Sequence, residues 1–217
     1  MVANGVFCAL DYTHGCVCNY QNQASLAMIH MPQAEMWTFS AYDRGSEPVQ
    51  RVGINFGVPG DRRGKNGTRW LEYPRASGPS PQLDMSLKGG AGRPLWFHAS
   101  RIQRGNPKWV AASALSDLMG VTVTLNAIAA IEREHTIRLY FAELEDFGPG
   151  GRIFSVSLQG KQVLDAFDIV KEAGGKNRCV IKQFKHVFLK SALEVSLIPT
   201  EESKAGPLLC GIEVIAE

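Results

Sequence analysis

The segment from residue 136 to residue 169, TIRLYFAELEDFGPGGRIFSVSLQGKQVLDAFDI, alternates apolar and polar side chains on both sides of turn-forming residues. Apolar residues occupy every second position from 137 to 141, and the alternation resumes from 153 to 158. The run GPGG at 148–151 separates the two stretches, and Gly160 follows the second. A period of two around turn residues predicts antiparallel β-strands. We therefore predict an all-β fold.

Several short motifs in fixed order resemble one family of domains. LYFAE at 139–143, GRIFSVSLQGKQVLDAFDI at 151–169 and GIEV at 211–214 resemble the C-terminal half of a malectin-like domain. VGINFG at 52–57 and NGTRW at 66–70 resemble its opening strand and the polar turn that follows. The resemblance covers about residues 49–217. It implies a jelly-roll-like β-sandwich that binds carbohydrate without catalysing a reaction.

The first 44 residues follow a different pattern. Their short apolar runs, at 6–10, 25–30 and 35–39, are too few to bury a core of their own. CVCNYQNQASLA at 16–27 and MWT at 36–38 resemble the last repeat of bacterial β-propellers related to pyrroloquinoline-quinone proteins, a type that precedes malectin-like domains in planctomycete-like proteins. The resemblance predicts a truncated propeller repeat at 1–44, a linker at 45–50 and the sandwich at 51–217. On this interpretation the chain is the C-terminal part of a larger propeller protein.

Hydropathy and cysteine content restrict location and metal chemistry. The sequence contains no run of eighteen apolar residues, so we predict no membrane span. The N-terminus lacks the pattern of a secretory signal. The resemblance places a full-length parent in the periplasm or at the cell surface. Two states are open for the N-terminal cysteines: a disulfide from Cys8 to Cys16 or Cys18, or reduced thiols. These cysteines lack the paired spacing of a zinc site. Cys179 and Cys210 are expected to be buried, and no metal site is predicted.

Positive charge is concentrated in the middle of the chain. Residues 51–110 hold eleven Lys or Arg against three Asp or Glu, although the whole chain carries only +2. The segment also holds six of the eleven prolines and lacks a long periodic run, which predicts loops laid over the sandwich. Cations among aromatic residues fit a nucleic-acid surface, a carbohydrate surface, or packed tryptophans with a solvated basic rim. No nucleic-acid motif accompanies the charge, so we predict no nucleic-acid partner.

Eight residues form the predicted glycan site. In the malectin-like family the loop after FAE supplies aromatic residues to the sugar site, whereas this chain has Leu-Glu-Asp-Phe at 144–147. The departure disfavours neutral glucose-rich glycans, and the basic segment favours acidic or sulfated ones. The predicted ligand-binding residues are Arg69, Trp70, Tyr73, Arg93, Trp96, Glu145, Asp146 and Phe147.

Signatures of catalysis are weak. Glu143 and Glu145 are two positions apart, so strand alternation places both on one face. Glycoside hydrolysis needs two carboxylates placed on opposite sides of the scissile bond, and this spacing gives no sign of that. The chain has no Gly-x-Ser-x-Gly, phosphate-binding loop or His-Glu-x-x-His motif. We predict neither catalytic residues nor a cofactor. The alternatives are a structural or protein-interaction domain docked on a β-propeller, and the tail of a quinone-dependent dehydrogenase-like protein with its chemistry elsewhere.

Overall fold

The computed structural model describes residues 35–38, 49–75, 83–125 and 132–217, together with the backbone of three short strands near the N-terminus. The chain forms two compact units, Met1–Glu35 and Met36–Glu217. In the first unit, β1 (Val2–Ala3), β2 (Val6–Ala9) and β3 (Leu26–Ile29) form an antiparallel sheet in sequential order. Two of the three predicted apolar runs in this region therefore contain a strand. The predicted boundaries at 44 and 51 stay a prediction.

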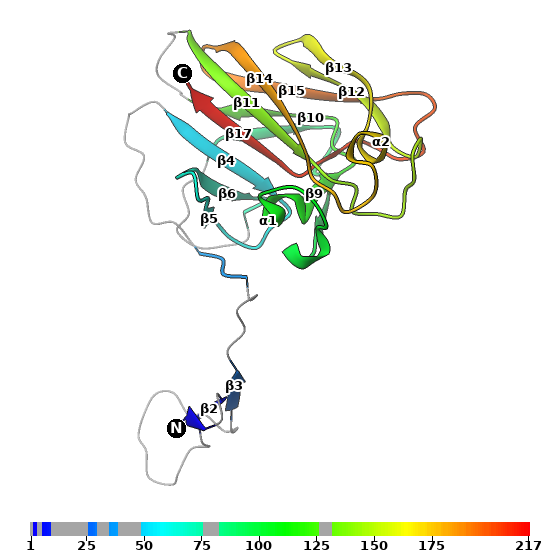
Figure 1. Cartoon of the computed structure of the whole chain (residues 1–217). Coiled ribbons are helices and arrows are strands. Elements are labelled where there is room, and N and C mark those ends of the chain that lie inside the picture. The colour runs from blue at the N-terminus through cyan, green and yellow to red at the C-terminus, as the bar shows by residue number, and fades with distance from the viewer. Residues whose placement is uncertain are drawn as a thin grey trace. The chain divides into compact units, whose positions relative to one another are not determined.

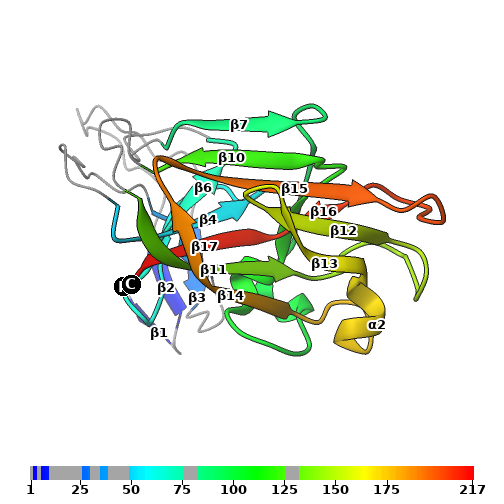
Figure 2. The same cartoon turned by 90° about the horizontal axis from the view of Figure 1, so that it is seen from above.

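The second unit is built on two large sheets that lie face to face (Figures 1 and 2). The first has the order β14-β11-β17-β4-β6-β5, formed by Val180–Leu189, Arg133–Phe141, Gly211–Ala216, Arg51–Phe56, Arg69–Tyr73 and Arg62–Arg63. The second has the order β13-β12-β15-β10-β7, formed by Lys161–Asp168, Ile153–Leu158, Ala192–Pro199, Gly120–Thr124 and Met85–Lys88. The predicted all-β sandwich is confirmed.

The second unit also contains a third, smaller sheet. It has the order β16-β9-β8, from Leu208–Leu209, Ser113–Ser116 and Arg93–Trp96. The short helices among the described residues are η1 (Ala99–Arg101), α1 (Lys108–Ala111) and α2 (Ile169–Ala173). The strand β9 follows shortly after α1. Its four side chains are all buried, which favours the pleated arrangement.

The two large sheets bury one continuous apolar core. Alternate residues of each strand supply it, such as Ile137, Leu139 and Phe141 of β11 and Phe154 and Val156 of β12. The three phenylalanines 141, 154 and 167 pack with ring centroids 5.0–5.9 Å apart. The period of two seen in the sequence is thus the period of burial.

The predicted strands of 136–169 exist, but they do not form one sheet. β12 and β13 form a hairpin, and Gln159 and Gly160 at its turn both have positive φ, as a tight hairpin turn requires. β11 instead pairs with β14 and β17 in the opposite sheet. The GPGG segment lies in the connection that crosses between sheets and does not form a hairpin. Alternation along the sequence does not show whether β11 and β12 form a hairpin or lie in opposite sheets, because the same residues are buried in either arrangement.

The basic middle segment is more regular than predicted. Residues 51–110 contain β4, β5, β6, β7 and β8 as well as loops. Short edge strands and a parallel pairing of β4 with β6 explain why no long alternating run marks them. Within the part of the chain that the structure describes, no helix has the length and apolar character to cross a membrane.

Candidate functional site

The outer face of the six-stranded sheet carries polar residues that are spaced by strand alternation. In β11 the core residues alternate with Arg138 and Tyr140, so these two side chains share the opposite face. In β17 Glu213 stands between the core residues Ile212 and Val214, and it pairs with neighbouring strands in register. The alternation therefore brings an arginine, a tyrosine and a glutamate together on one sheet face.

Trp70 lies flat on this face because two glycines leave room for it. A Cβ added to Gly53, the parallel partner of Trp70, would lie 2.2 Å from its Cδ2 atom. A Cβ added to Gly211 would lie 3.1 Å from Cζ3 of Trp70 and 2.8 Å from Cγ1 of Val110 in α1. The ring is 1% exposed and meets Trp109 and Tyr140 edge to face, with centroids 5.6 and 5.1 Å apart. The absence of side chains at Gly53 and Gly211 therefore lets the Trp70 indole pack against the sheet.

A cleft of about 840 Å³ opens above this aromatic floor. Residues of four segments line it: Arg62, Gly64, Lys65, Asn66, Trp70, Asn106, Pro107, Lys108, Trp109, Arg138, Tyr140, Ile181 and Gln183. Four of these residues are Arg or Lys, and none of the described lining residues is acidic. The cleft therefore combines aromatic and aliphatic walls with amide groups and a net positive charge. This combination suits a polar ring-shaped ligand that carries negative charge.

Glu213 holds the floor of the cleft in place. Its side chain is fully buried, and one carboxylate oxygen accepts hydrogen bonds from Asn66 Nδ2 at 3.0 Å and from the Thr68 hydroxyl. The other oxygen accepts from the Tyr140 hydroxyl at 3.0 Å and from Arg138 Nη1 at 3.1 Å. Burial alone would raise the pKa of Glu213, but the bonds from Thr68, Tyr140 and Arg138 outweigh it and hold the pKa below its ordinary value.

The same contacts fix the state of Tyr140. Burial and the adjacent Glu213 carboxylate raise the pKa of its phenol, so the hydroxyl stays protonated and donates to Glu213. Three cleft-lining residues, Asn66, Arg138 and Tyr140, are therefore oriented by a single buried carboxylate before any ligand arrives. Such preorganisation lowers the entropy that binding must overcome.

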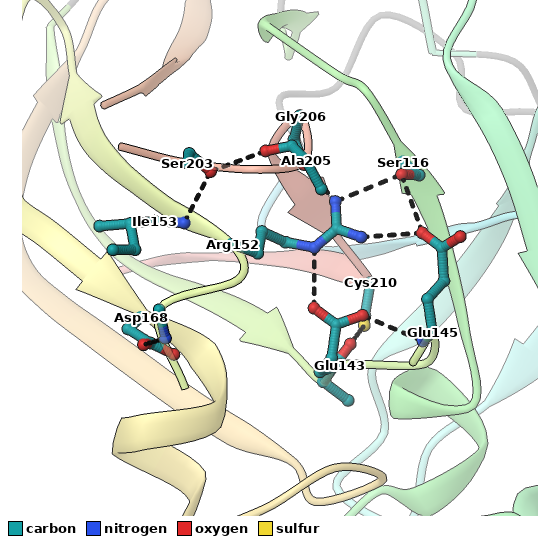
Figure 3. Close-up of polar contacts among 12 residues, drawn as sticks. Ser116, Glu143, Glu145, Arg152, Ile153, Asp168, Ser203, Ala205, Gly206 and Cys210 are labelled. Carbon is teal, nitrogen blue, oxygen red and sulfur yellow. Dashed lines mark hydrogen bonds and ion pairs between the residues drawn. The ribbon is translucent and has the colours of Figure 1, made fainter. Parts of the chain in front are cut away.

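A second polar cluster lies at the end of the sandwich, around the buried Arg152 (Figure 3). Arg152 donates from Nε to Glu143 and from Nη2 to Glu145, both at 2.8 Å. It also donates to the Ser116 hydroxyl at 3.3 Å and to the Gly206 carbonyl. The Glu145 backbone N–H donates to Glu143 at 3.0 Å. Arg152 thus binds both Glu143 and Glu145, and it ties the loop after β11 to β9 and to the segment before β16.

The predicted residues Arg93, Glu145 and Phe147 meet at this cluster. Arg93 Nη2 donates to Glu145 at 2.6 Å, and the guanidinium carbon of Arg152 lies 5.1 Å from the centre of the Phe147 ring. Burial would raise the pKa of Glu145, but Arg93 and Arg152 hold it below its ordinary value. The charge of Arg93 is therefore compensated within the protein, and the cluster has the character of a structural tie.

The other predicted site residues lie elsewhere. Trp70 forms the floor of the cleft, and Arg69 precedes it, half-buried, in β6. Tyr73 packs edge to face on Phe56, with ring centroids 6.0 Å apart. The remaining two are Trp96 at the end of β8, which is 51% exposed, and Asp146, which forms an ion pair with Lys176. The structure thus divides the eight residues between the cleft, the core and the loop end.

Most residues of the cleft and of its floor lie outside the predicted site. The missed residues include Asn66, Arg138, Tyr140, Gln183 and Glu213. Two signals pointed to them: a charged residue at the centre of the apolar strand GIEV, and the polar side of the alternation in TIRLYF. A charge inside an apolar strand indicates a paired buried group. Among the described residues, no group of three or more His, Cys, Asp or Glu is arranged to hold a metal ion.

Comparisons with known proteins agree with this architecture. Residues 125–212 match the family model of the Malectin domain. A probable leucine-rich repeat receptor-like serine/threonine-protein kinase of Arabidopsis thaliana is 28% identical over an alignment 118 residues long. The alignment covers 45% of this chain and 12% of that protein. The chain therefore spans only about an eighth of this relative.

Solved structures show the same fold at low identity. The extracellular domain of ANXUR2 from Arabidopsis thaliana has a TM-score of 0.59 at 16% identity, covering 76% of this chain and 48% of that one. Bacteroides uniformis β-glucuronidase has a TM-score of 0.58 at 19% identity, covering 77% of this chain and 18% of that one. Together with the match to the Malectin family model, these likenesses support a malectin-like domain.

Proposed function

We propose that this domain binds a glycan without catalysing a reaction, and that the cleft on the outer face of the six-stranded sheet is the binding site. The observation that carries the proposal is the composition of the cleft, where aromatic and aliphatic walls surround amide and guanidinium groups already oriented by Glu213. Sugars present apolar ring faces and a rim of hydroxyl groups, and such a site addresses both. The match to the Malectin domain model supports the same function.

We also propose that the glycan carries acidic or sulfated groups. The cleft holds Arg62, Lys65, Lys108 and Arg138, and only Arg138 forms an ion pair with a described residue. Uncompensated cations in a partly enclosed site attract carboxylate or sulfate groups. This location differs from the loop end that the family resemblance suggested, where Arg93 is already paired with Glu145.

The test compares two tryptophans. Binding of a panel of neutral, uronic-acid and sulfated oligosaccharides is measured by calorimetric titration for the wild type, for Trp109→Ala in the cleft and for Trp96→Ala outside it. We expect the first substitution to weaken binding at least about tenfold and the second to change it less than about twofold. Trp109→Phe and a thermal melt control for folding. Loss of binding in Trp96→Ala alone would move the site to β8, and no binding to any oligosaccharide would overturn the proposal.

A protein-interaction role is the second candidate. One structure with this fold, at 16% identity, is that of the plant peptide RALF23 in complex with FER and LLG2. If the ligand is a peptide, the same cleft residues should contribute to its binding, but none of the oligosaccharides in the panel should bind. Binding of an acidic peptide library by the wild type and not by Trp109→Ala would favour this candidate over the glycan.

We also propose that residues 1–44 originate from a propeller repeat of a larger parent protein. In that protein the sandwich would dock on the propeller, or another part of the chain would hold quinone-dependent chemistry. The sequential antiparallel order of β1, β2 and β3 supports it, because a propeller blade is built from such a meander. Sequencing the DNA upstream of Met1 tests it. An open frame with further propeller repeats is expected, and a stop codon directly upstream would contradict it.

A further inference from the structure

Arg62 lies between two indole rings at the cleft. Its guanidinium carbon is 5.5 Å from the centre of the Trp37 ring and 5.0 Å from that of Trp109. The two indoles meet edge to face, with centroids 6.2 Å apart and planes at 84°. Aromatic faces hold a guanidinium without neutralising its charge. The arginine is therefore fixed in position and remains a cation available to a ligand.

Arg62 has no compensating partner within the described part of the chain. It forms no ion pair with a described residue, and its Nη1 group is buried without a hydrogen-bond acceptor among them. An orphaned donor on a half-buried cation is costly to the free protein. Lys65 and Lys108, which line the same cleft, also lack ion pairs with described residues. Three cations that form no ion pair with a described residue thus line the cleft.

Trp37, one of the two rings, comes from the segment that precedes the first strand of the sandwich, β4. Thr38 pairs with Asp61 through two backbone hydrogen bonds of 3.0 and 2.7 Å, directly before Arg62. A Cβ added to Gly60 would lie 3.0 Å from Cβ of Trp37, so the glycine permits the close approach. Met36–Glu217 is one compact unit, so this contact is internal to the sandwich unit. Trp37 therefore acts on the cleft through Arg62 and Trp109.

We infer that Arg62 receives the anionic group, a carboxylate or a sulfate ester, of the sugar bound in the cleft, and that Trp37 is the residue that positions it. The inference rests on the proposed glycan-binding function and assigns its charge selectivity to one side chain. With Nη1 buried, Nε and Nη2 remain as the pair of donors that can face a carboxylate side by side. A lysine at position 62 would keep the charge but lose both the stacking and the paired donors.

The test uses trigalacturonate, its uncharged methyl ester and a sulfated trisaccharide, titrated into the full chain at low and high salt. Wild type is expected to bind the acid at least about tenfold more tightly than the ester. In Arg62→Gln and Arg62→Lys the affinity for the acid should fall about tenfold while that for the ester changes less than about twofold. Trp37→Ala should lower acid affinity by a smaller factor, and Trp37→Phe should restore part of it. Lys161→Gln, a charge loss on the exposed β12–β13 hairpin, is the matched control and should change nothing.

The outcomes separate the two levels of the inference. If neither the acid nor the ester binds, the glycan-binding function itself fails. If wild type binds both forms equally, glycan binding stands and the assignment of charge selectivity fails. If Arg62→Gln keeps the full preference for the acid, Lys65 or Lys108 carries the selectivity and the role of Arg62 is refuted. A thermal melt of each variant checks folding, and Arg62→Lys serves as the second variant because it preserves the charge. The sulfated sugar distinguishes sulfate from carboxylate as the group received.

Discussion

Replacing Glu213 by Gln tests whether one buried carboxylate organises the cleft. Each oxygen of Glu213 accepts two hydrogen bonds, from Asn66 and Thr68 on one side and from Tyr140 and Arg138 on the other. A glutamine keeps one acceptor oxygen and turns an NH₂ group toward the other pair of donors. Whichever way the amide is oriented, two donors lose their acceptor.

The size of the effect follows from the number of lost bonds. A hydrogen bond to a charged group contributes about 1.5–3 kcal/mol, and leaving a buried donor unpaired costs about 1–3 kcal/mol. Glu213 also forms an ion pair with Arg51, whose Nε lies 3.4 Å from a carboxylate oxygen. The side chains of Arg51 and Arg138 are 35% and 30% exposed, so water still reaches the charges that lose their partner. We therefore expect Glu213→Gln to lower the free energy of unfolding by about 3 kcal/mol at pH 7, less than the upper range for a fully buried pair. This corresponds to a fall in Tm of about 6–12 °C.

The effect depends on pH in a defined direction. The folded-state pKa of Glu213 is below its ordinary value of 4.5, so its contribution to stability is present above pH 4.5 and is lost as the pH falls through the folded-state pKa. Urea unfolding of wild type and Glu213→Gln between pH 7 and pH 3 measures the difference. The difference should be full at pH 7 and shrink below pH 4.5. Glu194→Gln, an exposed change on β15, is the control and should stay within about 0.5 kcal/mol.

A loss of less than about 1 kcal/mol at pH 7 would refute the assignment of Glu213 as the organising group. A difference that stays constant down to pH 3 would show that the charged form is not what stabilises the fold. Glycan affinity should fall together with stability, because Asn66, Tyr140 and Arg138 lose their fixed orientation.

Three further results are expected. Gly53→Ala places a Cβ where the Trp70 ring lies and should destabilise the fold by about 1–3 kcal/mol with a red-shifted tryptophan emission; an unchanged melt would contradict the packing described for the indole. Arg152→Met leaves the buried Glu143 without its charge partner and should cost about 3–5 kcal/mol by urea unfolding, whereas a loss below 1 kcal/mol would mean that the cluster is not a structural tie. Burial raises the pKa of Cys179 to about 12, so iodoacetamide at pH 8 should leave it unmodified in the folded chain, as peptide mapping by mass spectrometry would show.

The fold class could be predicted from the sequence because burial and strand pleat share a period of two. The strands at 137–141 and 153–158 were located by alternation alone, and the turn at Gly160 by its residue type. The sheet to which each strand belongs was not determined in this way. β11 and β12 are neighbours in sequence and lie in opposite sheets, because the connection between them is long enough to cross the core.

The candidate site was only partly readable from the sequence. Trp70 was identified from its motif, and the excess of positive charge in 51–110 identified the region that supplies Arg62, Lys65 and Lys108. Composition could not show that Arg93 is neutralised by Glu145 while Arg62 forms no ion pair with a described residue. That difference arises from contacts between residues tens of positions apart in the chain. Alternation determines which face of a strand a side chain occupies, but only the tertiary structure decides which charges meet, because side-chain pairing depends on distances that sequence separation does not encode.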